Sequence, residues 1–182
     1  TFNINPQAIE KAITSKTKAI VPVHLFGQPA AMDEILEIAK KNNLYVIEDN
    51  AQALGAYFKN KDGEKIKTGC IGDVGTTSFF PSKNLGCYGD GGAIFTNNDE
   101  LAHLIRGIAN HGMYKRYYHD VVGVNSRLDS IQAVVLNEKL KLLDTYNEKR
   151  RKSADTYTSF FKNNPKIITP KVVGDRNSHV FH

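Results

Sequence analysis

The feature of the sequence that most constrains the fold is an alternation of short apolar runs with an amphipathic segment. Residues 19–25 form an almost continuous apolar run, and residues 44–47 form a second one. Between them, residues 31–42 repeat apolar side chains at helical spacing and carry Lys40 and Lys41 near the carboxyl end, where a helix favours cations. Strand, helix and strand with short links predict a βαβ unit. We therefore predict an α/β fold with a mostly parallel sheet flanked by helices.

The rest of the chain extends this pattern. Residues 75–80 and 91–96 are predicted to be strands, and Asp99 is expected to cap the helix that follows. Residues 111–127 lack a regular period, which predicts a long loop. We expect three parts: a large domain over 1–127 truncated at its N-terminus, a long connecting helix over 128–163, and the truncated start of a small C-terminal domain over 164–182. The apolar stripe expected to bury the long helix comprises Ile131, Val134, Val135, Leu136, Leu140, Leu143 and Tyr146.

Composition limits the class of protein. The chain has 182 residues, of which 41% are hydrophobic, enough for one domain with a core of its own. No apolar run approaches the ~20 residues that cross a bilayer, and no signal peptide is recognisable, so we expect a cytoplasmic protein without membrane association. Cys70 and Cys87 are expected to be free thiols, and no cluster has the spacing of a metal site.

The net charge of +5 favours anionic partners. Residues 149–152 contribute four consecutive basic side chains, and Lys115 and Arg116 add two more. A solvated helix face and attraction to phosphates are both consistent with this pattern. Nucleic acid is disfavoured as a partner, because no nucleic-acid-binding motif is present.

Lys83 is the first candidate for chemistry. It follows the predicted strand 75–80, in a turn flanked by Pro81 and Gly86, so it should project from the end of the sheet, where open α/β folds bind ligands. A lysine amine can form a Schiff base with pyridoxal 5'-phosphate (PLP). Taken alone, Lys83 is more simply read as a solvated loop lysine.

Asp49 strengthens the case, because it also ends a predicted buried strand. Two parallel strands open onto the same edge of a sheet, so Asp49 and Lys83 should lie at one edge. PLP needs a carboxylate beside its pyridine nitrogen, since a protonated ring withdraws electrons from the reacting carbon. Without Lys83, Asp49 would be better explained as the cap of a following helix.

With these residues in place, the chain resembles the sugar aminotransferases of the DegT/DnrJ/EryC1/StrS type, within the fold-type I PLP enzymes. The resemblance covers roughly positions 19 to 160, with its motifs in family order. The matching segments are 22–29 (PVHLFGQP), 47–53 (IEDNAQA), 78–86 (SFFPSKNLG), 89–93 (GDGGA), 111–112 (HG) and 123–133 (GVNSRLDSIQA).

The resemblance implies a role for five residues of the cofactor site. Lys83 would hold the cofactor covalently and then shuttle the proton of the 1,3-shift. Asp49 would pair with the pyridinium nitrogen, Gln52 would lie near the ring and its hydroxyl, and Ser78 would bind the phosphate. Asn125 would reach the phosphate of the cofactor in the partner subunit, which implies a homodimer with shared active sites.

Four further side chains are implied to meet the nucleotide sugar: Arg127, His182, His111 and Tyr117. An arginine suits a diphosphate, because its guanidinium forms paired, charge-assisted hydrogen bonds. An ion pair of Arg127 with Asp129 or Glu138 is an equal alternative. His111 and Tyr117 would otherwise be packed surface residues.

The resemblance therefore predicts a PLP-dependent aminotransferase of polysaccharide or other amino-sugar biosynthesis. It would move an amino group from an amino acid, expected to be glutamate, to a 3-keto or 4-keto group of a nucleotide-diphosphate sugar, with a UDP-linked hexose as one candidate. Residues 180–182 weakly favour the 3-keto UDP sugars. The family's phosphate-cupping segment would precede Thr1, so we expect a fragment that is inactive by itself.

Three alternatives remain open. A PLP-dependent sugar dehydratase or deoxygenase would share the fold, but such relatives carry histidine where Lys83 stands. A catalytically inactive homologue would bind the nucleotide sugar without turning it over. A nucleotide-binding module of Rossmann type is disfavoured, because the turn at 26–30 lacks the glycine spacing of a dinucleotide site.

Overall fold

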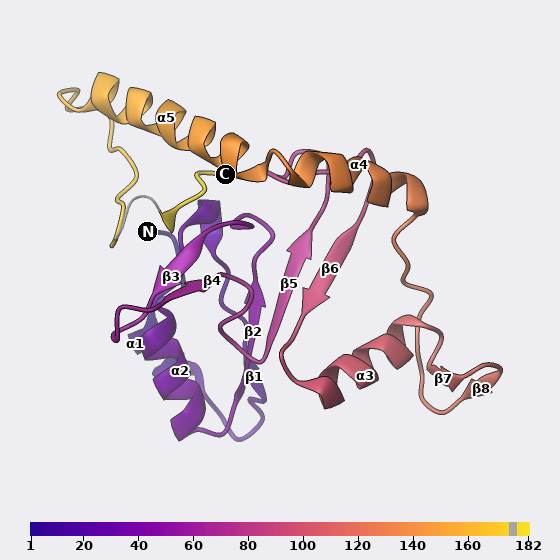
Figure 1. Cartoon of the computed structure of the whole chain (residues 1–182). Helices are drawn as coiled ribbons and strands as arrows, with labels where there is room; N and C mark the ends of the chain where they lie inside the picture. Colours follow the sequence, from indigo (N-terminus) through magenta and orange to yellow (C-terminus); the bar gives the residue numbers. More distant parts are fainter. Residues whose placement is uncertain (175–177) are drawn as a thin grey trace.

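The computed structural model describes residues 1–174 and 178–182, and its centre is a four-stranded sheet (Figure 1). The strands lie in the order β1 (Ala19–Ile20), β2 (Tyr45–Asp49), β5 (Val74–Ser78) and β6 (Gly92–Phe95). The first three are parallel, and β6 runs antiparallel to β5. The prediction of an α/β fold with a mostly parallel sheet is confirmed.

Helices α1 (Pro6–Ala12) and α2 (Met32–Lys41) pack together beside β1 and β2 (Figure 1). Asn5 starts α1 by accepting a hydrogen bond from the backbone of Gln7, and Pro6 occupies the first turn, where its missing N–H costs nothing. The core between the helices and the strands is formed by Ile9, Ile20, Ala30, Met32, Ile35, Ile38, Ala39 and Val46. The short 3-10 helix η1 (Leu25–Gly27) links the first strand to α2.

The two apolar runs are not buried on both faces of the sheet. Val46 and Glu48 point to the covered face and are buried, whereas Tyr45 on the other face is 60% exposed. Residues 19–25 do not form one continuous strand beside β2. β1 ends at Ile20, and further along only Val23 forms a parallel bridge, with Asp49. Pro22 lacks the N–H that a continuous ladder requires.

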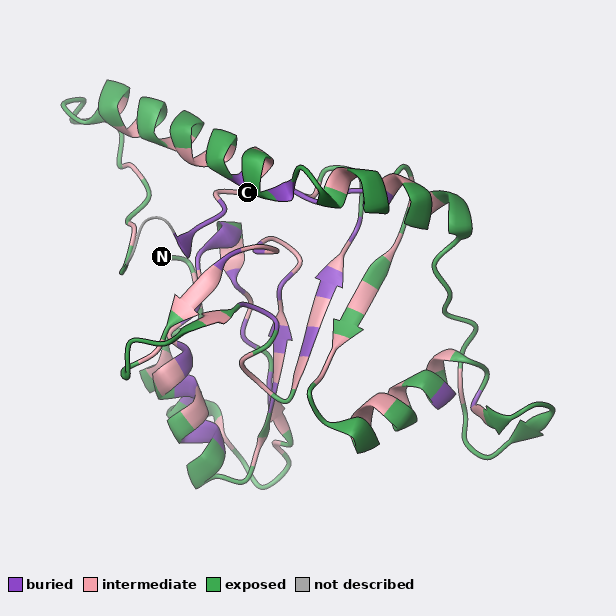
Figure 2. Ribbon diagram, in the orientation of Figure 1, coloured by how far each residue is buried: buried purple, intermediate pink, exposed green. Residues whose placement is uncertain are grey.

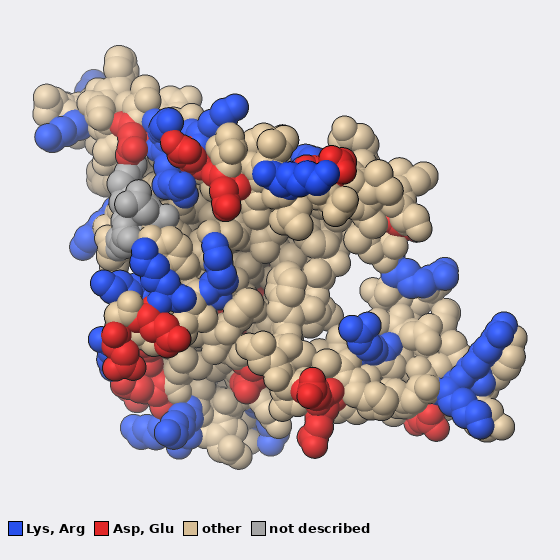
Figure 3. Space-filling model, viewed as in Figure 1, with Lys and Arg blue, Asp and Glu red and all other residues tan. Residues whose placement is uncertain are grey.

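Two small hairpins are separate from the main sheet, and helix α3 (Asp99–Ala109) follows its last strand (Figure 1). The hairpins are β3 (Tyr57–Lys59) with β4 (Lys65–Lys67), and β7 (Met113–Lys115) with β8 (Tyr118–His119). The predicted loop 111–127 therefore contains a hairpin, and Figure 3 shows basic side chains at its tip. The cap of α3 is Asn98 rather than Asp99, because the Asn98 side chain accepts hydrogen bonds from the backbones of Glu100 and Leu101.

The segment 128–163 forms two consecutive helices rather than one. α4 (Ser130–Leu140) and α5 (Leu143–Phe161) run end to end across the edge of the sheet to which β5 points (Figure 1). Leu136 and Leu143 are buried, but Ile131 is 74% exposed, so the expected buried stripe is only partly formed (Figure 2). None of the helices in the described ranges is both long enough and apolar enough to span a membrane.

Candidate functional site

The site lies at the carboxyl edge of the sheet, where β2 and β5 end side by side. Asp49 is the partner of Thr76 in the parallel register, and Ser78 ends β5 two residues further on. Because side chains alternate along a strand, Asp49, Thr76 and Ser78 point to the same face. A carboxylate and a hydroxyl from two neighbouring strands therefore share one edge and one face of the sheet.

Lys83 lies in the turn that follows β5 and leads back to β6. Its backbone N–H donates to Phe80 O at 2.9 Å, and Cys87 N donates to Phe79 O at 2.8 Å, so the turn is closed by its own backbone. Gly86 is required here, because a Cβ would lie 2.5 Å from Pro81 O. Within the described ranges, no hydrogen bond or ion pair engages the Lys83 ammonium group, which is therefore free to react.

Gln52 and His182 meet the backbone of Phe26 from opposite sides. Gln52 Oε1 accepts from Phe26 N at 2.7 Å, and His182 N donates to Phe26 O at 3.0 Å. Burial of its ring lowers the pKa of His182, and the positive charges of Lys83 and Arg150 lower it further. These effects favour the neutral form of the His182 ring.

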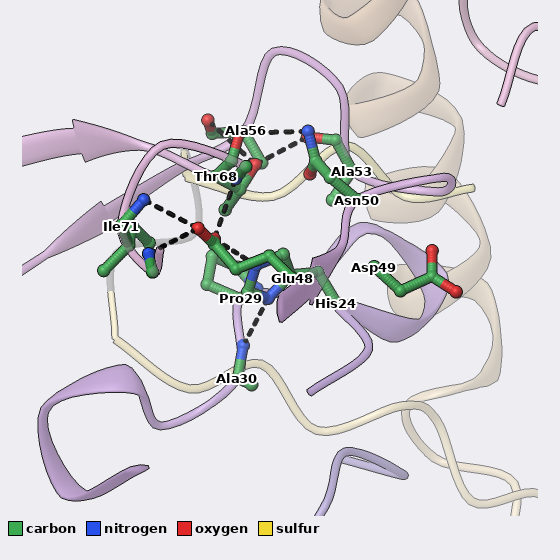
Figure 4. Close-up of polar contacts among 12 residues, drawn as sticks. His24, Pro29, Ala30, Glu48, Asp49, Asn50, Ala53, Ala56, Thr68 and Ile71 are labelled. Carbon is green, nitrogen blue, oxygen red and sulfur yellow. Dashed lines mark hydrogen bonds and ion pairs between the residues drawn. The ribbon is translucent and has the colours of Figure 1, made fainter. Parts of the chain in front are cut away.

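A buried polar network supports β2 on the face opposite Asp49 (Figure 4). Glu48 is fully buried and accepts four hydrogen bonds, from His24 Nε2 at 2.8 Å and from the backbone N–H groups of Gly69, Ile71 and Gly72. The other ring nitrogen of His24, Nδ1, accepts from Ala30 N at 3.0 Å, so the proton of the neutral ring is on Nε2. These contacts give His24 a structural role.

Four predicted substrate or partner-site residues belong to the segment that carries the β7–β8 hairpin and leads to α4 (Figure 1). They are His111, Tyr117, Asn125 and Arg127. Arg127 Nε donates to Asn125 Oδ1 at 2.9 Å, and Glu138 pairs with Lys141, so the alternative ion pair of Arg127 is replaced by a contact to an amide. Tyr117 is 75% exposed. Within one chain, these four residues do not join Lys83.

Sequence reasoning missed residues that position the site. Neither Glu48, next to Asp49, nor Asn84, next to Lys83, was predicted to have a role, although both are buried and hydrogen-bonded. Asn147, on α5, was not recognised either, because it lies in a polar run that resembles a solvated helix face. Their roles depend on contacts between distant segments, for which a single sequence carries no local signal.

Comparison with known proteins identifies the family of the chain. The model of the DegT/DnrJ/EryC1/StrS aminotransferase family matches residues 1–182. The chain belongs to this family. The resemblance noted from its motifs is therefore confirmed, and it extends over the full chain rather than only positions 19 to 160.

Individual relatives are about half identical to this chain over the aligned residues. A pleiotropic regulatory protein of Geobacillus stearothermophilus is 52% identical over 187 residues, which cover 100% of this chain and 48% of that protein. The UDP-2-acetamido-2-deoxy-3-oxo-D-glucuronate aminotransferase of Pseudomonas aeruginosa is 54% identical over 157 residues, covering 86% of this chain and 42% of that enzyme. The chain thus spans less than half the length of these curated relatives.

A solved family structure has the same fold and carries a cofactor. NtdA from Bacillus subtilis, with the cofactor PMP bound, is 36% identical and superposes with a TM-score of 0.86. The match covers 100% of this chain and 40% of that chain. A family fold that holds this cofactor is therefore present here at the level of the backbone.

Proposed function

We propose that the carboxyl edge of the sheet forms part of a PLP site, in a protein that transfers an amino group to a nucleotide-linked keto sugar. The observation that carries the proposal is the parallel register of β2 and β5. It brings Asp49 and the turn of Lys83 to the same edge of the sheet, as one pyridine ring requires.

The groups at this edge fit the cofactor chemically. Lys83 has an amine without a partner in the described part of the chain, as an amine that bonds to an aldehyde must. Asp49 uses Oδ1 to accept from Ala51 N at 3.0 Å, which orients the carboxylate away from the Glu48 network (Figure 4). Ser78 offers a hydroxyl on the same face for a phosphate oxygen.

Each side chain then has a separate task. When bound, PLP supplies an aldehyde for Lys83 and a ring that accepts electron density from the substrate carbon. Asp49 stabilises a proton on the ring nitrogen by its negative charge. Lys83 Nζ, once released, takes a proton from one carbon and returns it to another. His182, whose pKa is lowered by burial and by the charge of Lys83, is proposed to form one hydrogen bond with the sugar.

We propose a UDP-linked 3-keto sugar as the acceptor and glutamate as the donor. The Pseudomonas aeruginosa relative acts on a 3-oxo UDP sugar and is 54% identical, which supports this choice. Arg127, His111 and Tyr117 remain proposed substrate contacts. The check is a turnover screen of 3-keto and 4-keto UDP and dTDP sugars with glutamate, in which 2-oxoglutarate is measured.

The decisive experiment replaces the lysine. We expect the full-length protein to bind PLP with an absorption band that depends on Lys83, and Lys83→Ala to lose that band and all transamination. Lys61→Ala, which removes an exposed lysine far from the sheet edge, is the matched control and should keep both. An unchanged band in Lys83→Ala would refute the assignment.

A PLP-dependent sugar dehydratase is the second candidate on the same fold. Lys83 disfavours it, because dehydratases of this kind are expected to carry histidine at that position. Formation of 2-oxoglutarate with an aminated sugar supports the transaminase, whereas loss of water from the sugar without consumption of glutamate supports the dehydratase.

The proposal also includes a homodimer. In its own chain Asn125 pairs with Asn110 and accepts from Arg127, which is consistent with a contact to the cofactor of the partner subunit. A cytoplasmic location is proposed as well, because both cysteines are free thiols, as a reducing compartment favours. The domain boundaries at 127/128 and 163/164 remain predictions.

A further inference from the structure

The turn that carries Lys83 is held along its length by polar side chains of α4 and α5. Three contacts form a row: Gln132 Oε1 accepts from Tyr88 N at 2.8 Å, Lys139 Nζ donates to Gly86 O, and Asn84 Nδ2 donates to Asn147 Oδ1 at 3.1 Å. As α4 and α5 advance, the contacted positions move back along the turn towards Lys83. The row therefore ends beside Lys83, at the pair formed by Asn84 and Asn147.

This last contact also reaches the segment that follows Asp49. Asn84 Nδ2 lies 2.5 Å from Leu54 O, and Asn147 Nδ2 lies 3.2 Å from the same oxygen. Asn84 and Asn147 are only 4% and 2% exposed. Buried amides bonded in this way specify one arrangement, because a displaced partner would leave a polar group unsatisfied. One carbonyl and two side chains thus join three segments.

Gly55 brings the backbone close enough for this contact. Its φ is +90°, a conformation that favours glycine, and a Cβ there would lie 2.5 Å from Asn147 Nδ2. The backbone at Leu54 therefore approaches Asn147 more closely than any residue with a side chain at position 55 allows. The segment so anchored leads directly back to Gln52 and to Asp49 at the end of β2.

We propose that Asn84 and Asn147 form a positioning pair, which sets the separation between Lys83 and Asp49. Lys83 precedes Asn84, and Asp49 lies at the start of the segment that Leu54 anchors, so a shift of the pair would change both positions relative to one cofactor ring. The proposal rests on the proposed PLP site. Misplacement of reacting groups by ~1 Å can lower a rate up to roughly 100-fold, so this support should be visible in catalysis.

The test uses Asn147→Leu in the full-length protein loaded with PLP. Leucine has nearly the same size but can form neither hydrogen bond. We expect kcat to fall roughly 10- to 100-fold. The KM for the amino donor should change little, since the variant removes alignment rather than a substrate contact. The pH midpoint of the cofactor absorption band should also move, because the environment of Lys83 changes.

The matched control is Asn98→Ala, which removes an asparagine that caps α3 by two hydrogen bonds, far from Lys83. It should lower Tm while kcat and the absorption midpoint stay as in the wild type. Asn84→Ala should reproduce the shift of Asn147→Leu, and the double variant should shift no further, because both changes break the same contact.

Each outcome decides the question. A folded Asn147→Leu protein with lower Tm but wild-type kcat and absorption midpoint would show a merely structural role and overturn the proposal, as would additive shifts in the double variant. If Asn147→Leu does not fold, Asn84→Ala removes the other partner of the same contact, and the same shifts are expected of it. A wild-type protein that shows no cofactor band would refute the proposed function, and this inference with it.

Discussion

At the scale of single residues, Glu48 shows how a buried charge is kept. Burial opposes its ionisation, but the hydrogen bonds from His24 and from the backbones of Gly72, Gly69 and Ile71 outweigh burial and lower the pKa below the ordinary value of 4.5. The carboxylate is therefore charged near neutral pH. It joins the end of β2 to the 69–72 segment that precedes β5, directly behind Asp49.

The lowered pKa predicts a dependence of stability on pH. Because the folded state holds the Glu48 proton less tightly than the unfolded state, its contribution is present above about pH 4.5 and is lost as the pH falls through the lower folded value. We expect Glu48→Gln to reduce the free energy of unfolding near neutral pH by about 3 kcal/mol. Urea denaturation near pH 7 and near pH 4 measures both effects, and the difference from wild type should shrink on acidification.

Glu148→Gln is the control for this experiment. The pKa of Glu148 is also lowered, by its hydrogen bond and attraction to Lys152, but the carboxylate is exposed to solvent. Its removal should leave the free energy of unfolding almost unchanged. An equal effect of the two substitutions would show that the buried network adds no more to the free energy of unfolding than an exposed ion pair does.

The sequence allowed some of these residues to be predicted. Lys83 and Asp49 were recognisable because each follows an apolar strand, and the end of a strand fixes the edge to which a side chain belongs. Glu48 and Asn147 were not recognised, because their partners come from segments 20 or more residues away.

At the scale of elements, the packing of the 69–72 segment on β5 depends on a glycine. A Cβ on Gly75 would lie 2.0 Å from Gly69 O, which is backbone and cannot rotate away. At Gly107 in α3 the nearest atom, at 2.2 Å, belongs to the side chain of Tyr114. These two glycines therefore differ in what must move if a methyl group is added.

We expect Gly75→Ala to destabilise the protein by more than about 3 kcal/mol, because backbone must separate from backbone. Gly107→Ala should cost at most about 1 kcal/mol, since Tyr114 can change rotamer and alanine favours the helix by a similar amount. Thermal unfolding of the two variants compares them directly. Equal losses would contradict the distinction between backbone and side-chain obstacles.

The elements themselves were predicted unevenly. The βαβ unit was correct because its apolar periods are strong, and β2 ends at Asp49 as its pattern indicates. The break between α4 and α5 was missed: the residues around Lys141 include no proline or glycine, and Leu142 simply adopts a backbone that ends the regular hydrogen bonds. The β7–β8 hairpin was missed because its strands are only three and two residues long.

At the scale of the whole molecule, α4 presents an apolar face to solvent. Ile131 and Val134, three residues apart on one side of the helix, are 74% and 66% exposed. Apolar side chains grouped in this way are typical of surfaces that another protein covers. Asn125, which is proposed to serve a partner subunit, precedes α4 by only a few residues.

We therefore expect the full-length protein to be a dimer that Ile131→Asp weakens. A carboxylate in the centre of an apolar interface is costly, because it must be buried without a partner. Sedimentation velocity over a range of concentrations measures the effect. Phe160→Asp, which changes a side chain on α5 that is 80% exposed, is the control and should leave the association state as it is. A dimer that is equally stable in both variants would place the interface elsewhere.

The antiparallel pairing of β6 has one further consequence for Lys83. The lysine lies in a hairpin whose two strands are paired from Ser78 with Gly92 onwards, and Phe79 N donates to Gly91 O at 2.7 Å just inside. Deuterium from solvent can reach the amides of Phe79 and Cys87 only when this hairpin opens. We therefore expect Lys83 to belong to a segment that stays closed as long as β5 and β6 stay paired, and not to a loop that moves independently of the sheet.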